Sequence, residues 1–299
     1  MKNKLITVIL LLGFILFFSD GALACVGARP HGMGGAFIGV ADDINAVYWN
    51  PAGLVQLEGS EFTWTRTLNN RDVINYDDFL ATGSWIKELG LAYAFGYINI
   101  ADYYPVNYTK DYTLVFKDEK IQWLIFSVAK KITSRLSIGG NIRYMDYYLG
   151  FEAAGYWPEV DSTTFFGLDL SLFYQADDKI AFGLLIQDVN RPEFRIFDRN
   201  MYYIRNVRPG ISYRITDSLL FTASIYDLLQ EVPIEKIPNE NRLRVGLEQK
   251  FDQLSIRAGL ENGNRTLGLG IDEEHIMVDY VFLGDDLGDT HMLGCTFKF

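Results

Sequence analysis

The chain has 299 residues, of which 15% are aromatic and 22% are charged, and its formal net charge is -11. This length is enough for one large domain or two small ones. The acidity argues against a nucleic-acid partner, because neutralising phosphates needs clustered Lys and Arg. Cys25 and Cys295 are the two cysteines, too few for a fold that depends on disulfide bonds.

The N-terminus has the three regions of a secretory signal peptide. Two lysines lie within the first four residues, Leu5–Phe18 is an apolar run, and residues 22–24 (Ala-Leu-Ala) match the small-x-small cleavage pattern. The apolar run is shorter than an ordinary membrane span. We therefore predict that residues 1–24 are removed and that the mature chain is exported. Cys25 directly follows the cut, so its lipidation stays open as an alternative.

Residues 25–59 show neither the alternation of a strand nor the stripe of an amphipathic helix. Their glycines permit tight turns and close packing, and they form no phosphate loop, because the Gly-Lys-Ser/Thr ending is missing. The stretch DDINAVYW predicts one short helix, which an aspartate caps and an Asn-Pro pair ends. We interpret residues 25–59 as a hatch inside a barrel, with a periplasmic tail as the alternative. The residues on which a hatch would depend are Gly34, Gly35, Asp42, Asp43, Trp49, Asn50, Pro51 and Ala52.

From residue 60 onward, apolar residues recur at every second position, which is the period of a β-strand. This pattern predicts strands near residues 60–68, 78–86, 89–98, 121–131, 134–148, 162–175, 179–187, 204–214, 218–227, 241–251, 254–262, 264–272, 274–282 and 290–299. Most of them are longer than the roughly 5–6 residues of a strand in a soluble sandwich. They match the roughly 9–11 residues with which a tilted strand crosses a bilayer.

The connections between these strands alternate between long and short. The long ones are 69–77, 99–120, 149–161, 188–203 and 228–240, and the others are mostly turns of one to three residues. Such alternation is typical of outer-membrane barrels, which have short periplasmic turns and longer outer loops. We therefore predict an all-β fold in the cell outer membrane: a 14-stranded antiparallel transmembrane β-barrel over residues 60–299. A soluble sandwich or soluble barrel is the alternative.

Charged residues share the parity that faces the predicted lumen. The main ones are Arg208, Arg214, Arg242, Arg244, Glu248 and Arg257, and Lys250, Glu261, Asp169, Asp272 and Asp279 have the same parity. Buried charges must pair or meet water. One interpretation is a structural lattice of ion pairs. The other is a polar track or docking surface for the hatch, with Asp42 and Asp43 as partners of the arginines.

No local pattern predicts catalysis or metal binding. The histidines His31, His275 and His291 are dispersed, without the spacing of a metal site. No nearby Ser-His-Asp arrangement is visible, although barrel enzymes assemble such groups across strands. We therefore expect no enzyme activity, no cofactor and no metal.

One stretch resembles a known family. Residues 27–54, GARPHGMGGAFIGVADDINAVYWNPAGL, resemble the FadL-type outer-membrane transporter superfamily, and most closely its PorV/PorQ-like branch. The resemblance implies a 14-stranded barrel with an N-terminal hatch, and Asn50, Pro51 and Ala52 match the hatch motif. In the FadL branch it implies passage of long-chain fatty acids or other hydrophobic molecules, by way of the hatch and a lateral opening in the wall. In the PorV-like branch it implies a partner role in protein secretion and surface attachment.

Two functional hypotheses follow. The first is an outer-membrane barrel that passes small hydrophobic, fatty-acid-like compounds by hatch-gated diffusion, with gating at Asp42, Asp43, Trp49, Asn50 and Pro51. The second is a non-conducting component of protein secretion. The expected partners are outer-membrane lipid and either hydrophobic small molecules or a secreted protein.

Overall fold

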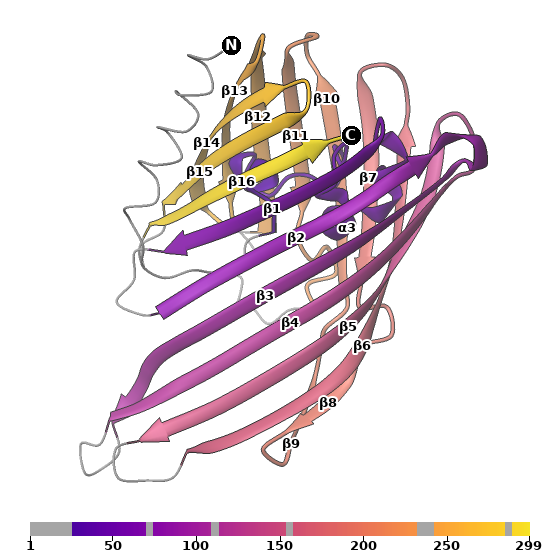
Figure 1. Cartoon of the computed structure of the whole chain (residues 1–299). Coiled ribbons are helices and arrows are strands. Elements are labelled where there is room, and N and C mark those ends of the chain that lie inside the picture. Colours follow the sequence, from indigo (N-terminus) through magenta and orange to yellow (C-terminus); the bar gives the residue numbers. More distant parts are fainter. Residues whose placement is uncertain (1–25, 70–73, 109–113, 154–157, 232–241, 285–288) are drawn as a thin grey trace.

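The structure is a computed structural model. It describes residues 26–69, 74–108, 114–153, 158–231, 242–284 and 289–299. Fourteen strands close into one antiparallel barrel, in which β1 (Ser60–Asn69) pairs with β16 (Thr290–Lys298) (Figure 1). This confirms the predicted fold class. The predicted signal peptide and Cys25 lie outside the described residues.

The strands between β1 and β16 follow one another around the barrel. They are β2 (Ile74–Ile86), β3 (Leu91–Tyr108), β4 (Leu114–Lys131), β5 (Leu136–Ala153), β6 (Glu159–Gln175), β7 (Ile180–Gln187), β10 (Asn206–Arg214), β11 (Leu219–Ile225), β12 (Leu243–Phe251), β13 (Leu254–Glu261), β14 (Asn264–Glu273) and β15 (Ile276–Gly284). Each predicted strand overlaps one of the barrel strands. Between β13 and β14, Asn262 and Gly263 both have positive φ, which suits a two-residue hairpin turn.

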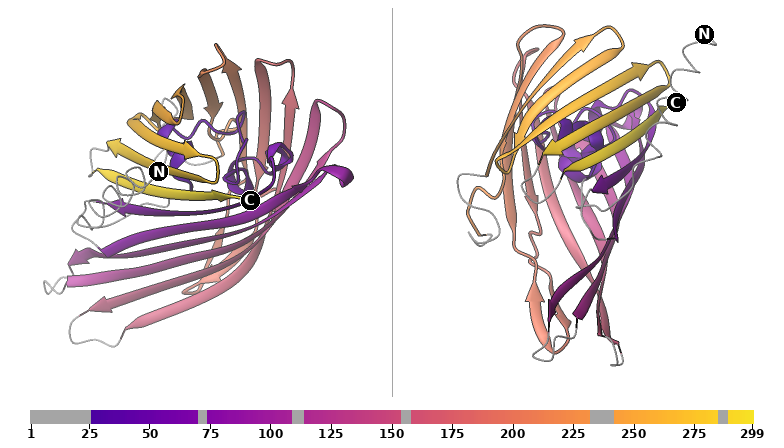
Figure 2. Two further views of the ribbon diagram at one scale, coloured as in Figure 1. Left: turned by 45° about the horizontal axis from the view of Figure 1, so that its top comes forward. Right: turned by 90° about the vertical axis from the view of Figure 1, so that its left-hand side faces the viewer.

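One wall of the barrel is much taller than the rest. Residues 99–120 and 149–161 were predicted as long outer loops, and this prediction was wrong, because most of both ranges is strand. β3, β4 and β5 have 18 residues each, and this wall projects beyond the other strands (Figures 1 and 2). The predicted loop 188–203 contains a separate hairpin of β8 (Glu193–Ile196) and β9 (Arg199–Tyr202), which packs against β6.

The sequence pattern did not predict the outer ends of these long strands, and the outer face of the tall wall shows why. A row of polar residues, paired from strand to strand, crosses β1 to β6: Arg66, Asp78, Asn99, Gln122, Asp146 and Thr164. The next row towards the short turns is mostly apolar: Trp64, Leu80, Tyr97, Leu124, Tyr144 and Phe166. Apolar alternation ends where the outward face meets water, so it no longer marks the strand.

On the shorter wall, the outward and inward faces differ sharply. Leu243, Leu267 and Leu269 point outward and are 50–58% exposed, whereas Arg244 and Arg257 point inward and are buried. Apolar side chains outside and charged side chains inside are the reverse of a soluble barrel. A bilayer also demands a sheet without free edges, because unpaired backbone groups are costly in hydrocarbon. The chain is therefore an outer-membrane β-barrel.

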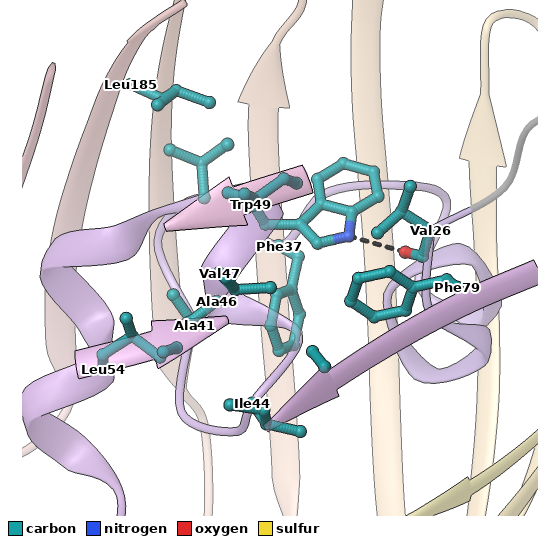
Figure 3. Packing of buried hydrophobic residues seen from close by; sticks show 14 of the residues in the cluster. Val26, Phe37, Ala41, Ile44, Ala46, Val47, Trp49, Leu54, Phe79 and Leu185 are labelled. Atoms are coloured by element: carbon teal, nitrogen blue, oxygen red, sulfur yellow. Dashed lines mark hydrogen bonds between the residues drawn. The ribbon is translucent and has the colours of Figure 1, made fainter. Parts of the chain in front are cut away.

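The largest buried cluster lies inside the barrel. It joins the N-terminal segment, which we define as residues 26–59, to inward faces of β2, β3 and β4 (Figure 3). The segment contains three short helices, α2 (Ala28–Gly32), α3 (Ala46–Trp49) and the 3-10 helix η1 (Pro51–Gln56). A further 3-10 turn, η2 (Lys87–Leu89), follows β2. Among the described residues, no helix is long and apolar enough to cross a membrane.

The lipid-facing assignment of the outer surface can be tested at Leu269, in the middle of β14. We expect Leu269→Arg to destabilise the folded barrel in vesicles by about 2–4 kcal/mol, because it places a charge in hydrocarbon. Asp217→Arg, in an exposed periplasmic turn, is the control and should change it by less than about 0.5 kcal/mol. Urea titrations in lipid vesicles measure both. Equal small effects would contradict the assignment.

Candidate functional site

The N-terminal segment fills the part of the lumen that it occupies. Met33, Phe37, Ile44 and Trp49 are at most 2% exposed. All four belong to one buried cluster with Phe79 of β2, and Figure 3 shows Phe37 and Trp49 next to Phe79. Strands from both walls surround the segment in two views (Figures 1 and 2). The segment is thus the natural candidate for controlling passage through the barrel.

The wall approaches the segment closely through inward-facing glycines. A Cβ on Gly183 would overlap the Ile38 carbonyl oxygen, and one on Gly259 would overlap the Gly34 nitrogen. The glycines that meet the segment in this way are Gly139, Gly183, Gly210, Gly246, Gly259, Gly268 and Gly294. Gly34 itself has φ +62, a conformation that side chains disfavour. Glycine on both sides therefore lets backbone pack directly on backbone.

Small polar side chains of the wall bind the backbone groups of the segment. Ser212 donates to the Gly39 carbonyl at 2.7 Å, and Ser137 donates to the Ala52 carbonyl at 2.7 Å. The Ala52 N–H donates to Ser171 at 2.9 Å. Similar bonds come from Asn141 to Val47, from Thr222 to Ala36 and between Thr266 and both Gly32 and Gly34. Because the segment has little regular secondary structure, these bonds satisfy groups that would otherwise be buried unpaired.

Asn50 links the segment to itself and to the wall. Its side chain is fully buried, and its Nδ2 donates to the Ile38 carbonyl at 2.8 Å and the Leu172 carbonyl at 3.1 Å. Pro51 then begins η1. The predicted aspartate cap is absent in its expected form: α3 has Asn45 at its N-cap without a side-chain cap, and Asp43 instead accepts from the Asn45 N–H at 2.8 Å. The predicted short helix is present as one turn, which begins at Ala46 and ends before Asn50.

The charges of the segment pair mainly through Arg29. Its guanidinium donates to Asp42 at 2.6 Å, to Asp43 at 2.8 Å and to Glu248 of β12 at 3.0 Å. Burial lowers the pKa of Arg29, but the three carboxylates outweigh burial and hold this pKa well above its ordinary value. Asp42 and Asp43 therefore pair within the segment, whereas the sequence predicted lumen arginines as their partners. The prediction did not consider Arg29, a cation in the same segment that binds both aspartates.

Two further chains of ion pairs extend from the segment into the wall. Glu248 also accepts from Arg257 at 2.6 Å, and Arg257 donates to Asp279 of β15 at 2.6 Å. His31 lies 2.6 Å from Glu261, which also faces Arg244 at 3.4 Å. These contacts make the predicted ion-pair lattice continuous with the segment. Breaking a buried pair on one side is costly, about 3–5 kcal/mol.

The other predicted lumen charges differ from one another. Arg242 is buried and pairs with Asp227. Arg214 is exposed at the periplasmic rim, where with Asp42 and Lys179 it lines a small open pocket. Arg208 is buried but makes no ion pair with a described carboxylate: it donates to Gln187 at 2.5 Å and lies 4.4 Å from the Tyr226 ring centre.

Trp49 connects the segment to its own beginning. Its Nε1–H donates to the Val26 carbonyl at 2.8 Å (Figure 3). Its ring meets His31 at 5.3 Å and Tyr48 at 5.5 Å between centroids, both edge to face. The segment thus folds back on itself as one unit.

Next to Tyr48, aromatic side chains gather on the inner face of the tall wall. Tyr48 stacks on Trp123 at 6.3 Å, Trp123 meets Tyr203 at 6.4 Å, and Phe165 stacks on Phe194 at 4.4 Å. We call Tyr48, Trp123, Phe165, Phe194 and Tyr203 the aromatic cluster. Sequence reasoning missed it, because its members come from the segment, β4, β6, β8 and the end of the hairpin. Only the sheet register brings them together.

The described residues contain no group of three or more His, Cys, Asp or Glu side chains that could hold a metal ion. Cys295 is a free thiol on the outward face of β16. These observations leave the segment, its ion pairs and the aromatic cluster as the candidate site.

The close packing of the N-terminal segment against the wall can be tested at Gly183. We expect Gly183→Val to displace the segment, because the new side chain would collide with Ile38 and Asn50. Overpacking of about 1–3 kcal/mol should speed hydrogen exchange in residues 33–50 about tenfold or more. Gly284→Val is the control, since a Cβ there would meet nothing closer than 3.5 Å. If hydrogen exchange in residues 33–50 were unchanged in Gly183→Val, the segment would not pack on the wall in this way.

Comparison with known proteins relates the whole barrel to solved structures. No protein-family profile matches the chain, and no curated protein matches it. Many solved structures are similar to it, and three of them follow. The CymD monoaromatic hydrocarbon channel is 14% identical with a TM-score of 0.67, covering 94% of this chain and 99% of that chain. The Pseudomonas putida toluene transporter TodX is 12% identical with a TM-score of 0.69, covering 93% and 99%.

The third structure is a Pseudomonas aeruginosa FadL homologue, 11% identical with a TM-score of 0.65, covering 94% of this chain and 99% of that chain. The titles that name an activity describe channels and transporters. The likeness extends over nearly the whole chain at low identity, so the chain shares the 14-stranded fold of the FadL-type outer-membrane channels.

Proposed function

We propose that the chain is an outer-membrane channel that passes small hydrophobic, fatty-acid-like compounds by diffusion past the N-terminal segment, which acts as a hatch. The observation that carries this proposal is the aromatic cluster, which joins the segment to the inner face of the tall wall. The similar structures titled as a hydrocarbon channel and a toluene transporter support the same ligand class.

The aromatic cluster offers an apolar surface of the right kind. Its rings lie 4.4–6.4 Å apart in stacked, tilted and edge-to-face arrangements. A ligand that leaves water to lie against such rings gains about 25 cal/mol per Å² of buried apolar area. Because Tyr48 belongs to α3, a ligand at the cluster touches the segment directly. Displacing Tyr48 is then the first step by which a ligand loosens the hatch.

Arg208 gives the site a polar end. It is 5% exposed, its Nε has no hydrogen-bond partner, and the Tyr48 hydroxyl lies beside it. Arg242, Arg244 and Arg257, in contrast, each face a carboxylate. A carboxylate forms stronger hydrogen bonds with a guanidinium than a neutral hydroxyl does. A fatty-acid-like ligand would therefore compete with Tyr48 for Arg208 while its apolar part lies on the aromatic cluster.

The polar end predicts a difference between charged and neutral ligands. We expect Arg208→Gln to weaken binding of a medium-chain fatty acid by about 1.5–3 kcal/mol, the value of a hydrogen bond to a charged group. Binding of toluene should be unchanged. Tryptophan fluorescence titration of the purified barrel in detergent measures both ligands.

The control for this experiment is Arg195→Gln, which removes an exposed arginine of the hairpin that pairs with Asp198. It should change the binding of neither ligand. Equal losses of binding for fatty acid and toluene in Arg208→Gln would show that Arg208 has only a structural role. If Trp123→Ala changed the binding of neither ligand, the aromatic cluster would not be the site.

Hatch gating depends on the ion pairs of Arg29, with Asp42, Asp43, Trp49, Asn50 and Pro51 as the expected gating residues. We expect Arg29→Met to loosen the segment, because it leaves Asp42 and Asp43 without their cation and removes one of the two arginines that bind Glu248, a cost of about 3–5 kcal/mol. Single-channel conductance in planar bilayers should rise. Arg66→Met is the control: it breaks an outward pair with Asp78 that is partly exposed, worth less than about 1 kcal/mol.

The same recordings separate the two hypotheses for function. A barrel that stays closed in Arg29→Met, takes up no fatty acid in vesicles and co-purifies with a secreted protein would be the PorV-like secretion component instead. Conductance and uptake that rise together in the variant support the channel.

A further inference from the structure

The β8–β9 hairpin lies against the tall wall without being part of the barrel sheet. Its two strands form a sheet of their own, and β8 packs on β6 near the projecting end of the wall (Figure 1). Among the described residues, no bond between backbone groups joins residues 193–202 to the wall. The Phe197 N–H donates to the Asp161 carboxylate at 2.7 Å. The hairpin is therefore attached to the wall mainly by its side chains.

Two phenylalanine rings of the hairpin make this attachment. Phe194 stacks on Phe165 of β6 with 4.4 Å between ring centroids and an angle of 5° between the rings, and it meets Tyr147 of β5 at 5.6 Å. Phe197 meets Phe151 of β5 at 5.8 Å. Contacts between rings are also what a hydrophobic ligand offers to this wall. The hairpin and a ligand would thus use the same kind of interaction.

The turn of the hairpin is built at a local cost. Phe197 and Asp198 connect the two strands, and their φ angles are 46° and 61°. A two-residue turn with positive φ at both positions favours Asn-Gly or Asp-Gly, and a bulky side chain is disfavoured there. The ring of Phe197 packs on the wall, which offsets this cost. A residue that is locally unfavourable but makes such a contact points to a role for the contact.

The base of the hairpin, in contrast, is fixed to the sheet. The Asn190 side chain donates to the Phe166 carbonyl at 2.8 Å and accepts from the Leu168 N–H at 2.9 Å, so it continues the edge of β6. The Tyr203 N–H donates to the Pro192 carbonyl at 3.0 Å and closes the neck of the hairpin. A fixed base below a part that only side chains hold is the arrangement of a hinged cover.

Phe194 covers the ring on which a ligand would lie. Phe165 is 7% exposed, and Phe194 stacks on its face. Phe194 also lies 5.8 Å from Tyr203, which itself lies 5.4 Å from Phe165. Two rings cannot stack on the same face at the same place. A ligand therefore reaches this face of Phe165 only when Phe194 moves away.

We propose that the β8–β9 hairpin is a lid on the aromatic cluster, and that a hydrophobic ligand opens it by taking the place of Phe194 on Phe165. The inference deepens the proposed function and rests on it. In the absence of ligand, the lid keeps Phe165 out of water. When the lid is closed, the site is not available, so the apparent affinity for ligand is lowered by the fraction of closed molecules.

Phe194→Ala tests the lid through the direction of its effect. We expect this variant to bind toluene about twofold to tenfold more tightly than the wild-type protein, because the ligand no longer has to break an aromatic pair. If Phe194 were only part of the ligand-binding surface, the same change would weaken binding. Tryptophan fluorescence titration of the purified barrel in detergent measures the affinity. The matched control is Tyr202→Ala, which removes a 65% exposed aromatic side chain of the same hairpin and should leave binding unchanged.

Hydrogen exchange in the wild-type protein tests the opening itself and depends on no variant. We expect saturating toluene to speed exchange in residues 193–202 about twofold or more, because the hairpin loses its packing and its bond to Asp161 when it opens. Exchange in residues 136–146 of β5, which pair on both sides, should stay unchanged. Slower exchange in residues 193–202 would show that toluene binds beneath a closed hairpin, and it would overturn the lid.

The titrations also separate the lid from the proposed function. Binding of toluene that is present in the wild-type protein and weaker in Phe194→Ala would overturn the lid and leave the proposed function in place. If neither protein bound toluene or a medium-chain fatty acid, the proposed function and the lid would both be overturned.

Discussion

A buried backbone with little regular secondary structure must find partners for its remaining polar groups outside itself, and this constraint explains the inner wall of the barrel. The N-terminal segment contains only short helices and turns, so part of its N–H and C=O groups has no partner within it. Wall residues of two kinds resolve this: glycines let the segment approach, and Ser, Thr and Asn side chains bind it. The segment is therefore held by many directional contacts spread over opposite sides of the lumen.

Charge adds a second level of control to this arrangement. Arg29 is a single cation among three carboxylates, two from its own segment and one from β12. It folds the segment on itself and ties it to the wall at the same point. Glu248 is shared with Arg257, so a change at Arg29 reaches β13 and β15 through buried ion pairs. The segment and the lumen lattice therefore respond as one electrostatic unit.

The tall wall gives the barrel its asymmetry. β3 to β6 continue well past the row of polar residues where the outward apolar side chains end. The inner face of this wall carries Trp123, Phe165 and the packed hairpin, so the aromatic cluster lies between the wall and Tyr48 of the segment. The apolar surface and the hatch thus share a side chain, and that shared contact couples ligand binding to movement of the segment in the proposed mechanism.

The sequence alone determined the strand number, the face of each strand that meets lipid and the place of the unusual stretch at residues 27–54. These properties follow from local period two, because a bilayer imposes the same rule on every spanning strand. Only the tertiary structure decided the height of the tall wall, the pairing of Asp42 and Asp43 with Arg29, the contacts of Arg208 with Tyr48 and Tyr226, and the aromatic cluster. Each of these depends on strand register and on contacts across the lumen. Residues far apart in the chain become neighbours there, and no local pattern records that.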